Sequence, residues 1–172
     1  TACVNVQNDP LNCGVCGTAC MGTANGTAAC VAGTCSVTCN AGYARQGSAC
    51  VLVPAPRPVW PPSGSLSTSA RPTFRWTLAA PVNGAVLEVC ATRACTTVVQ
   101  RVTASGSSTT LPTALPVGRY FWRLLGRIDA TPGTVSNAPW EFTVERTTAP
   151  MVGSTWGQRL DFNGDGLADV ST

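Results

Sequence analysis

Eight cysteines crowd the first fifty residues, and no other feature limits the possible folds of this chain so strongly. They are Cys3, Cys13, Cys16, Cys20, Cys30, Cys35, Cys39 and Cys50. A segment this small buries too little apolar surface to fold on a hydrophobic core alone, and disulfides commonly supply the missing stability. Clustered zinc sites are the competing interpretation, but the chain has no His, so each ion would need four thiolates. The sequence therefore predicts a disulfide-rich module over residues 1–51 and an oxidising compartment.

The pairing of these cysteines remains open, because eight cysteines allow about 105 connectivities. Gly, Asn, Thr and Ala separate them, which predicts turns and irregular loops rather than strands or helices. The exception is the run from Cys30 to Cys35, whose spacing fits a short hairpin.

Two parts of this module resemble known cysteine-rich families. The run Asp-Pro-Leu-Asn-Cys-Gly-Val-Cys-Gly-Thr-Ala-Cys from Asp9 to Cys20, together with Cys3, resembles the stigma-specific-type repeats of secreted bacterial and plant proteins. The tail that begins Cys-Asn-Ala-Gly-Tyr at Cys39 and ends at Cys50 is similar to the last loop of EGF-like modules. Both resemblances imply a disulfide-bonded module of a secreted protein.

Residues 52–64 are rich in proline. Pro54, Pro56, Pro58, Pro61 and Pro62 favour an extended, semi-rigid spacer of the polyproline type. Recognition by a proline-reading domain is the alternative, but that mode is mainly intracellular. We therefore expect a linker between the cysteine-rich module and the region that follows.

Residues 65–146 alternate apolar and polar side chains in short runs, which is the pattern of half-buried strands. The dipeptide Asn83-Gly84 is typical of tight hairpin turns. Six or seven short strands with turn signals between them predict a β-sandwich. We expect strands at residues 72–78, 85–90, 97–102, 109–112, 118–127 and 140–145.

The stretch Leu115-Pro-Val-Gly-Arg-Tyr120 precedes the longest of these strands. It resembles the tyrosine corner of fibronectin type III and related immunoglobulin-like domains, and Trp76 and Trp140 also fit that family. The resemblance implies that the Tyr120 hydroxyl bonds an upstream backbone group and fixes the crossover between two sheets. Cys90 and Cys95 lie between two strands at a spacing that allows a structural disulfide.

Residues 147–172, a linker followed by an acidic loop, contain the one pattern that points to ligand chemistry. Short acidic and amide side chains alternate before Gly166. Ca²⁺ takes about six to eight oxygen ligands at once, and a glycine turn lets such side chains converge on one point, whereas Mg²⁺ tends to keep its waters. A solvated turn without metal is the alternative. The candidate ligands are the side chains of Asp161, Asn163, Asp165 and Asp169 and the backbone carbonyl of Leu167.

An EF-hand would need Glu at the twelfth position of this loop, where Thr172 stands, and flanking helices. The loop instead resembles the Asp-x-Asn/Asp-x-Asp-Gly-x-x-Asp loop of FG-GAP repeats, the calcium-binding hairpins of integrin-type propellers. One such hairpin cannot build a propeller, because several blades are needed to bury a common core. We therefore expect that the native protein continues and that this loop begins a truncated repeat.

An enzyme is not expected, since His is absent and the carboxylates outside the acidic loop are dispersed. We expect a non-enzymatic secreted or cell-surface multimodular protein of adhesion or matrix type, with a calcium-stabilised C-terminal segment. One alternative is a structural subunit of an extracellular filament assembled by strand addition. Another is the accessory region of a larger secreted hydrolase.

Charge and hydropathy bear on the partners. The net charge is only +3 and the Arg residues are scattered singly, so nucleic acid is not an expected partner. No apolar run approaches the length of about 18 residues that a membrane span requires. The expected partners are other extracellular proteins or glycans, with self-association as a further option.

Overall fold

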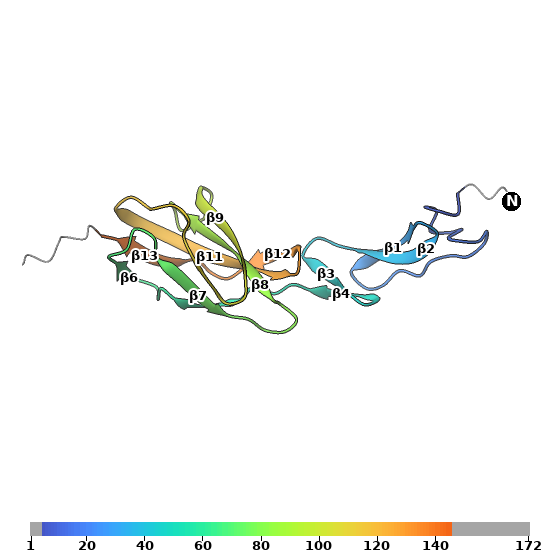
Figure 1. The fold of residues 1–172 in the computed structure, drawn as a ribbon, viewed down its shortest axis with the longest axis horizontal. Helices are drawn as coiled ribbons and strands as arrows, with labels where there is room; N and C mark the ends of the chain where they lie inside the picture. The colour runs from blue at the N-terminus through green and yellow to red at the C-terminus, as the bar shows by residue number, and fades with distance from the viewer. Residues whose placement is uncertain (1–4, 146–172) are drawn as a thin grey trace, which may run out of the picture.

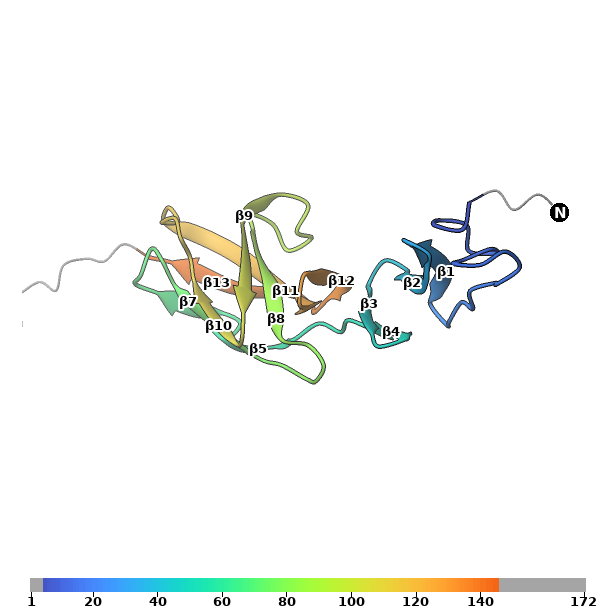
Figure 2. The same ribbon diagram turned by 45° about the vertical axis from the view of Figure 1, so that its right-hand side comes forward.

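A computed structural model describes residues 5–145 of the chain. Every regular element in that range is a β-strand (Figure 1). Two hairpins lie towards one end of an elongated arrangement and two sheets lie towards the other, as both ribbon views show (Figures 1 and 2). The prediction of a mainly β chain, with a disulfide-rich module followed by a β-sandwich, is confirmed.

The cysteine-rich module contains more regular structure than its composition predicts. Strands β1 (Gly26–Val31) and β2 (Thr34–Cys39) form one antiparallel hairpin, and β3 (Tyr43–Gln46) and β4 (Ala49–Leu52) form a second. Ala32 and Gly33 make the first turn with φ of 49° and 75°, the positive values that a two-residue hairpin turn requires. The short hairpin expected between Cys30 and Cys35 is confirmed as the turn end of β1 and β2. The expectation of irregular loops is wrong for the rest of residues 26–52, although residues 5–22 contain no strand.

Three described disulfides hold this module together. Cys13–Cys30 and Cys20–Cys35 tie the N-terminal loop to the first hairpin, and Cys39–Cys50 joins the end of β2 to β4. Cys30 and Cys35 lie opposite each other in the hairpin but bond to different partners. Cys16 is also disulfide-bonded, and residues 5–145 contain no free cysteine.

The Asp9-to-Gly17 loop is organised by two side chains. Asp9 accepts hydrogen bonds from the Leu11 backbone N–H and the Asn12 side-chain amide, at 2.9 and 2.7 Å. Asn12 in turn accepts from the Gly17 backbone N–H at 2.9 Å. The Asn12 amide, followed by the Leu11 N–H, lowers the pKa of the Asp9 carboxyl below its ordinary value. The Asp-x-x-Asn-Cys-Gly motif thus shapes the loop.

Two sheets form the sandwich. The smaller sheet has the order β10-β7-β5, and the larger has the order β6-β13-β11-β8-β9, with β12 paired to β11. β6 runs parallel to β13, whereas the other pairs are antiparallel. The strands are β5 (Arg57–Trp60), β6 (Ser65–Ser67), β7 (Thr73–Thr77), β8 (Gly84–Cys90), β9 (Val98–Ser105), β10 (Ser108–Thr110), β11 (Gly118–Ile128), β12 (Thr131–Ser136) and β13 (Trp140–Val144).

An aromatic cluster fills the space between the two sheets. Phe74 of β7 packs edge-on against Trp122 of β11 and Phe142 of β13, with ring centroids 5.0 and 5.5 Å apart. All three rings are fully or almost fully buried. Trp140 stacks edge-on against Trp122 and is half-buried. Phe74, Trp122 and Phe142 thus form the buried apolar face of β7, β11 and β13, as expected for strands in which apolar and polar side chains alternate.

The corner before β11 has the predicted contact. The Tyr120 hydroxyl donates a hydrogen bond to the Pro116 carbonyl at 3.0 Å, four residues upstream, and the ring packs near Phe142. Cys90 and Cys95 form the predicted disulfide, with Cα atoms 5.1 Å apart. Phe121 packs against this buried disulfide on the other side of β11 from the core.

Two sequence-based expectations about turns and linkers are wrong. Residues 57–60, expected within a proline-rich linker, form β5 at an edge of the smaller sheet. An edge strand tolerates proline because the outer side of the strand needs no backbone donor. Asn83 and Gly84 do not form a turn, since Gly84 begins β8. Asn83 instead exchanges hydrogen bonds with the Asp129 side chain and backbone, at 2.6 and 2.9 Å.

A small second core joins the module to the sandwich. Val53 is fully buried and packs with Ala44 of the module and with Val82 and Ile128 of the sandwich. The backbone carbonyls of Val53 and Pro54 lie so close to β11 and β12 that a Cβ atom on Gly126 or Gly133 would overlap them. Residues 52–56 therefore pack between the two parts rather than span them freely.

Candidate functional site

The predicted calcium ligands Asp161, Asn163, Asp165, Leu167 and Asp169 lie outside the described residues. The calcium site therefore stays a prediction. The described part of the chain offers three other groupings of functional side chains: a cysteine cluster, a charged network and a hollow that contains an exposed tryptophan.

The cysteine cluster lies in the module. The sulfur atoms of Cys13, Cys20 and Cys35 fall within 4.8 Å of one another, a spacing that metal ligands could share. Each of these sulfurs is bonded in a disulfide, however, and a metal needs deprotonated thiolates. The cluster is the meeting point of two disulfides, and in this form it has no thiolate to offer a metal.

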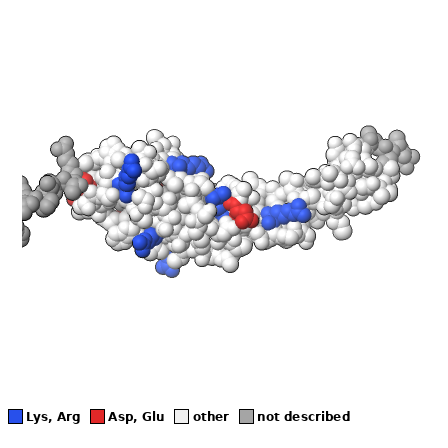
Figure 3. Space-filling model, in the orientation of Figure 1, with Lys and Arg blue, Asp and Glu red and all other residues white. Residues whose placement is uncertain are grey.

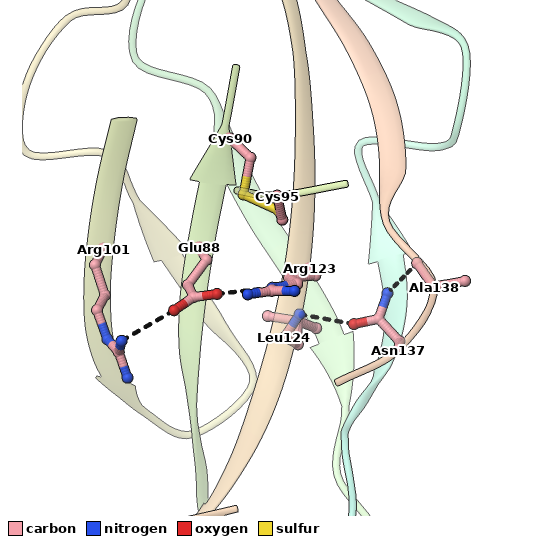
Figure 4. A network of polar contacts seen from close by, with 8 residues as sticks. All are labelled: Glu88, Cys90, Cys95, Arg101, Arg123, Leu124, Asn137 and Ala138. Atoms are coloured by element: carbon pink, nitrogen blue, oxygen red, sulfur yellow. Dashed lines mark hydrogen bonds and ion pairs between the residues drawn. A yellow bond between two sulfur atoms is a disulfide. The ribbon is translucent and has the colours of Figure 1, made fainter. Parts of the chain in front are cut away.

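The charged network lies on the face of the larger sheet that points away from the core. Glu88 is buried and stands between Arg101 of β9 and Arg123 of β11, with nitrogen–oxygen distances of 3.0 and 2.7 Å (Figure 4). The three residues are direct cross-strand partners, so the pairing follows from the register of β9, β8 and β11. Both Glu88 oxygens are used in these contacts, which makes the row a structural brace.

A second group places Glu141 of β13 between two arginines closer to the surface, one from β11 and one from the connection between β8 and β9. Glu141 accepts a hydrogen bond from Arg93 at 3.4 Å and forms an ion pair with Arg119 at 3.7 Å. The Arg93 guanidinium also lies 5.4 Å from the centre of the Phe121 ring. Both arginines are largely exposed, so these pairs add little stability. The basic side chains on the face drawn in Figure 3 lie apart from one another rather than in a continuous stripe.

The hollow lies on the outer face of the smaller sheet. It has a volume of about 340 Å³ and is lined by Val59, Trp60, Thr73 and Arg75. Val59 and Trp60 are 48% and 52% exposed, although both are large apolar side chains. The hollow thus combines an aromatic surface with a guanidinium and a hydroxyl.

A β-bulge turns Trp60 onto this face. Pro58 lies opposite Trp76 and is buried, so strict alternation would bury the side chain two residues later as well. The register shifts between Pro58 and Trp60, and Trp60 lies opposite Arg75 instead of Phe74. Bulges often re-aim a side chain in this way next to functional sites.

The hollow is the part of the candidate site that sequence reasoning missed. The prolines around Trp60 indicate a linker, and a tryptophan in a linker carries no ligand signal. The sequence does indicate the other half of the hollow, because Thr73, Arg75 and Thr77 alternate with apolar residues and so form the polar face of the next strand. What the sequence could not supply is the bulge that brings Trp60 to that face.

The described residues contain no helix of the length and apolarity that a membrane crossing requires. No family model matches the chain, and a search of the curated proteins finds no match to it.

Proposed function

We propose that this chain is a non-enzymatic part of a secreted or cell-surface multimodular protein of adhesion or matrix type, with a calcium-stabilised C-terminal segment. The observation that carries the proposal is the disulfide framework. Four disulfides lie within residues 5–145, and three of them hold a module that buries few other apolar side chains. Such frameworks form and persist in oxidising compartments.

The junction between the two parts supports a role in spacing or presentation. Val53 fills a core that contains residues from both the module and the sandwich. A packed junction holds two modules at a fixed distance, whereas a flexible linker would let each move independently. Adhesion and matrix proteins benefit from the first arrangement, because a rigid spacer presents a binding surface away from its anchor.

The location can be tested on the source cells. Surface proteolysis of intact cells, followed by peptide mapping without reduction, should release this chain with Cys13–Cys30, Cys20–Cys35 and Cys39–Cys50 intact. Protection from the protease until the cells are lysed, together with four or more free thiols in the recovered chain, would contradict the proposal.

The calcium segment can be tested separately. Asp165→Ala should abolish Ca²⁺ binding in calorimetry, because Asp165 contributes a charged oxygen at the centre of the predicted ligand set. Glu145→Ala removes one exposed carboxylate outside that set and serves as the matched control. Equal Ca²⁺ affinity in the native chain and the Asp165 variant would refute the ligand set.

One observation favours a filament subunit as the second candidate. β9 ends the strand order of the larger sheet, extends over eight residues without proline, and exposes Val98 and Val99. Such an edge can accept a strand from a neighbouring chain. Sedimentation velocity with Ca²⁺ and with chelator separates the candidates: a monomer in both conditions supports the adhesion module, and large assemblies support the filament.

A further inference from the structure

The hollow at Trp60 offers a ligand a small apolar platform. Its two exposed apolar side chains, Val59 and Trp60, are too few for the core of a stable protein interface, which buries about 800 Å² on each partner. The hollow volume of about 340 Å³ instead falls at the low end of the range for small-ligand sites, about 300–1,000 Å³. The platform therefore suits one or two rings of a small or repeating ligand.

The charge beside the platform is positive, and no ion pair among residues 5–145 compensates it. Arg75 lies opposite Trp60 in the sheet, and Arg57 is exposed further along β5. Strands β5, β7 and β10 contain no Asp or Glu, and none of the ion pairs within residues 5–145 involves either arginine. A guanidinium without an ion-pair partner can bind a carboxylate through two parallel hydrogen bonds. A ligand that carries a carboxylate therefore fits the charge of this site.

Hydroxyl groups continue the polar surface of the hollow. The Thr73 and Thr110 hydroxyls lie 2.8 Å apart on neighbouring strands, and Ser108 lies opposite Arg75. A hydroxyl both donates and accepts, so the Thr73–Thr110 pair still has lone pairs and one proton to offer to a ligand. This mixture suits a ligand that itself carries several hydroxyls.

We infer that the hollow binds an acidic oligosaccharide that contains uronic acid. The C–H bonds on one face of a sugar ring carry partial positive charge, which the negative face of the Trp60 indole attracts. Arg75 then holds the carboxylate, while Thr73 and Thr110 hydrogen-bond to ring hydroxyls. The inference deepens the proposed function and rests on it, because matrix polysaccharides are partners only for a chain outside the cell.

The test uses the full chain and a short oligosaccharide of galacturonic acid, with its methyl ester as the neutral counterpart. Calorimetry should detect binding of the acid and much weaker binding of the ester. Trp60→Ala should lower the affinity by about tenfold or more, which corresponds to about 1.4 kcal/mol, whereas Trp60→Phe should retain most of it. Arg75→Gln should abolish the preference for the acid over the ester.

Arg119→Gln is the matched control, because Arg119 is equally basic but lies on the larger sheet with Glu141. It should leave the affinity unchanged. The inference is overturned by equal affinity in the native chain and the Trp60→Ala variant, by absence of binding at millimolar ligand, or by equal binding of a glutamate-rich peptide of the same charge. These outcomes would not affect the proposed extracellular location. Glycan binding by a chain that is found inside the cell would instead contradict the proposed function.

Discussion

In the cysteine-rich module the buried apolar side chains are Cys13, Cys30, Ala44 and Cys50, so three of the four are parts of disulfides. The sandwich buries twelve residues in one aromatic and aliphatic cluster and contains a single disulfide. The module is thus stabilised mainly by disulfides that reduce the conformational entropy of the unfolded chain. The sandwich is stabilised mainly by removing apolar surface from water. The two parts should respond differently to the same perturbation.

The largest expected effect follows from deleting the centre of the sandwich core. Trp122 is fully buried and contacts Phe74 and Trp140, so Trp122→Ala should lower the free energy of unfolding by about 3–5 kcal/mol. Trp60→Ala, at a half-exposed tryptophan, should cost much less. Urea denaturation followed by circular dichroism measures both, and equal losses would show that the core does not dominate the stability of the sandwich.

The second-largest effect is expected from removing a disulfide of the cysteine-rich module. Removing the 17-residue link with Cys13→Ala and Cys30→Ala together should destabilise the module by about 3 kcal/mol, because the unfolded chain regains the entropy of that loop. Cys90→Ala with Cys95→Ala opens a five-residue link in a sandwich that retains its core, so its cost should be smaller. A larger loss of unfolding free energy for the Cys90 and Cys95 variant would contradict the view that the module depends on disulfides more than the sandwich does.

The sequence predicts the sandwich better than the module because the sandwich is stabilised by apolar burial, which leaves an alternating pattern in the sequence, whereas the module is stabilised by disulfides. Phe74, Trp122 and Phe142 belong to strands whose alternation reports the buried face directly. The hairpins of the module carry small residues with weak alternation, and their disulfide partners depend on three-dimensional proximity that spacing does not encode. The shared core at Val53 and the bulge at Trp60 could not be predicted from the sequence either. The prolines around them indicate a break in regular structure, but they do not show that this segment pairs with the edge of the smaller sheet.

The third effect concerns the junction. Val53→Ala removes two methyl groups from a fully buried site and should cost about 2 kcal/mol. More informatively, it should separate the thermal transitions of the module and the sandwich, which share this core. Val59→Ala lies in the same segment but is half-exposed, so it is the control. Scanning calorimetry shows whether one transition becomes two; identical traces for both variants would mean that the junction is not a shared core.

The smallest effect is a pH dependence within the module. The folded pKa of Asp9 is lowered by the Asn12 amide and the Leu11 N–H, so its stabilising contribution is fully present above the ordinary carboxyl pKa. That contribution is lost as the pH falls through the lowered value. Asp9→Asn should therefore differ from the native chain at neutral pH and approach it in acid. A stability difference between them that grows on acidification would contradict this sign.

Hydrogen exchange with and without a reductant tests the contrast between the two parts most directly. Reduction should remove protection from the amides of β1, β2, β3 and β4 while those of β7, β8, β11 and β13 keep theirs, because the aromatic core does not depend on the cysteines. Loss of protection in the sandwich together with the module, or persistent protection of the reduced module, would show that the two parts are not stabilised in different ways.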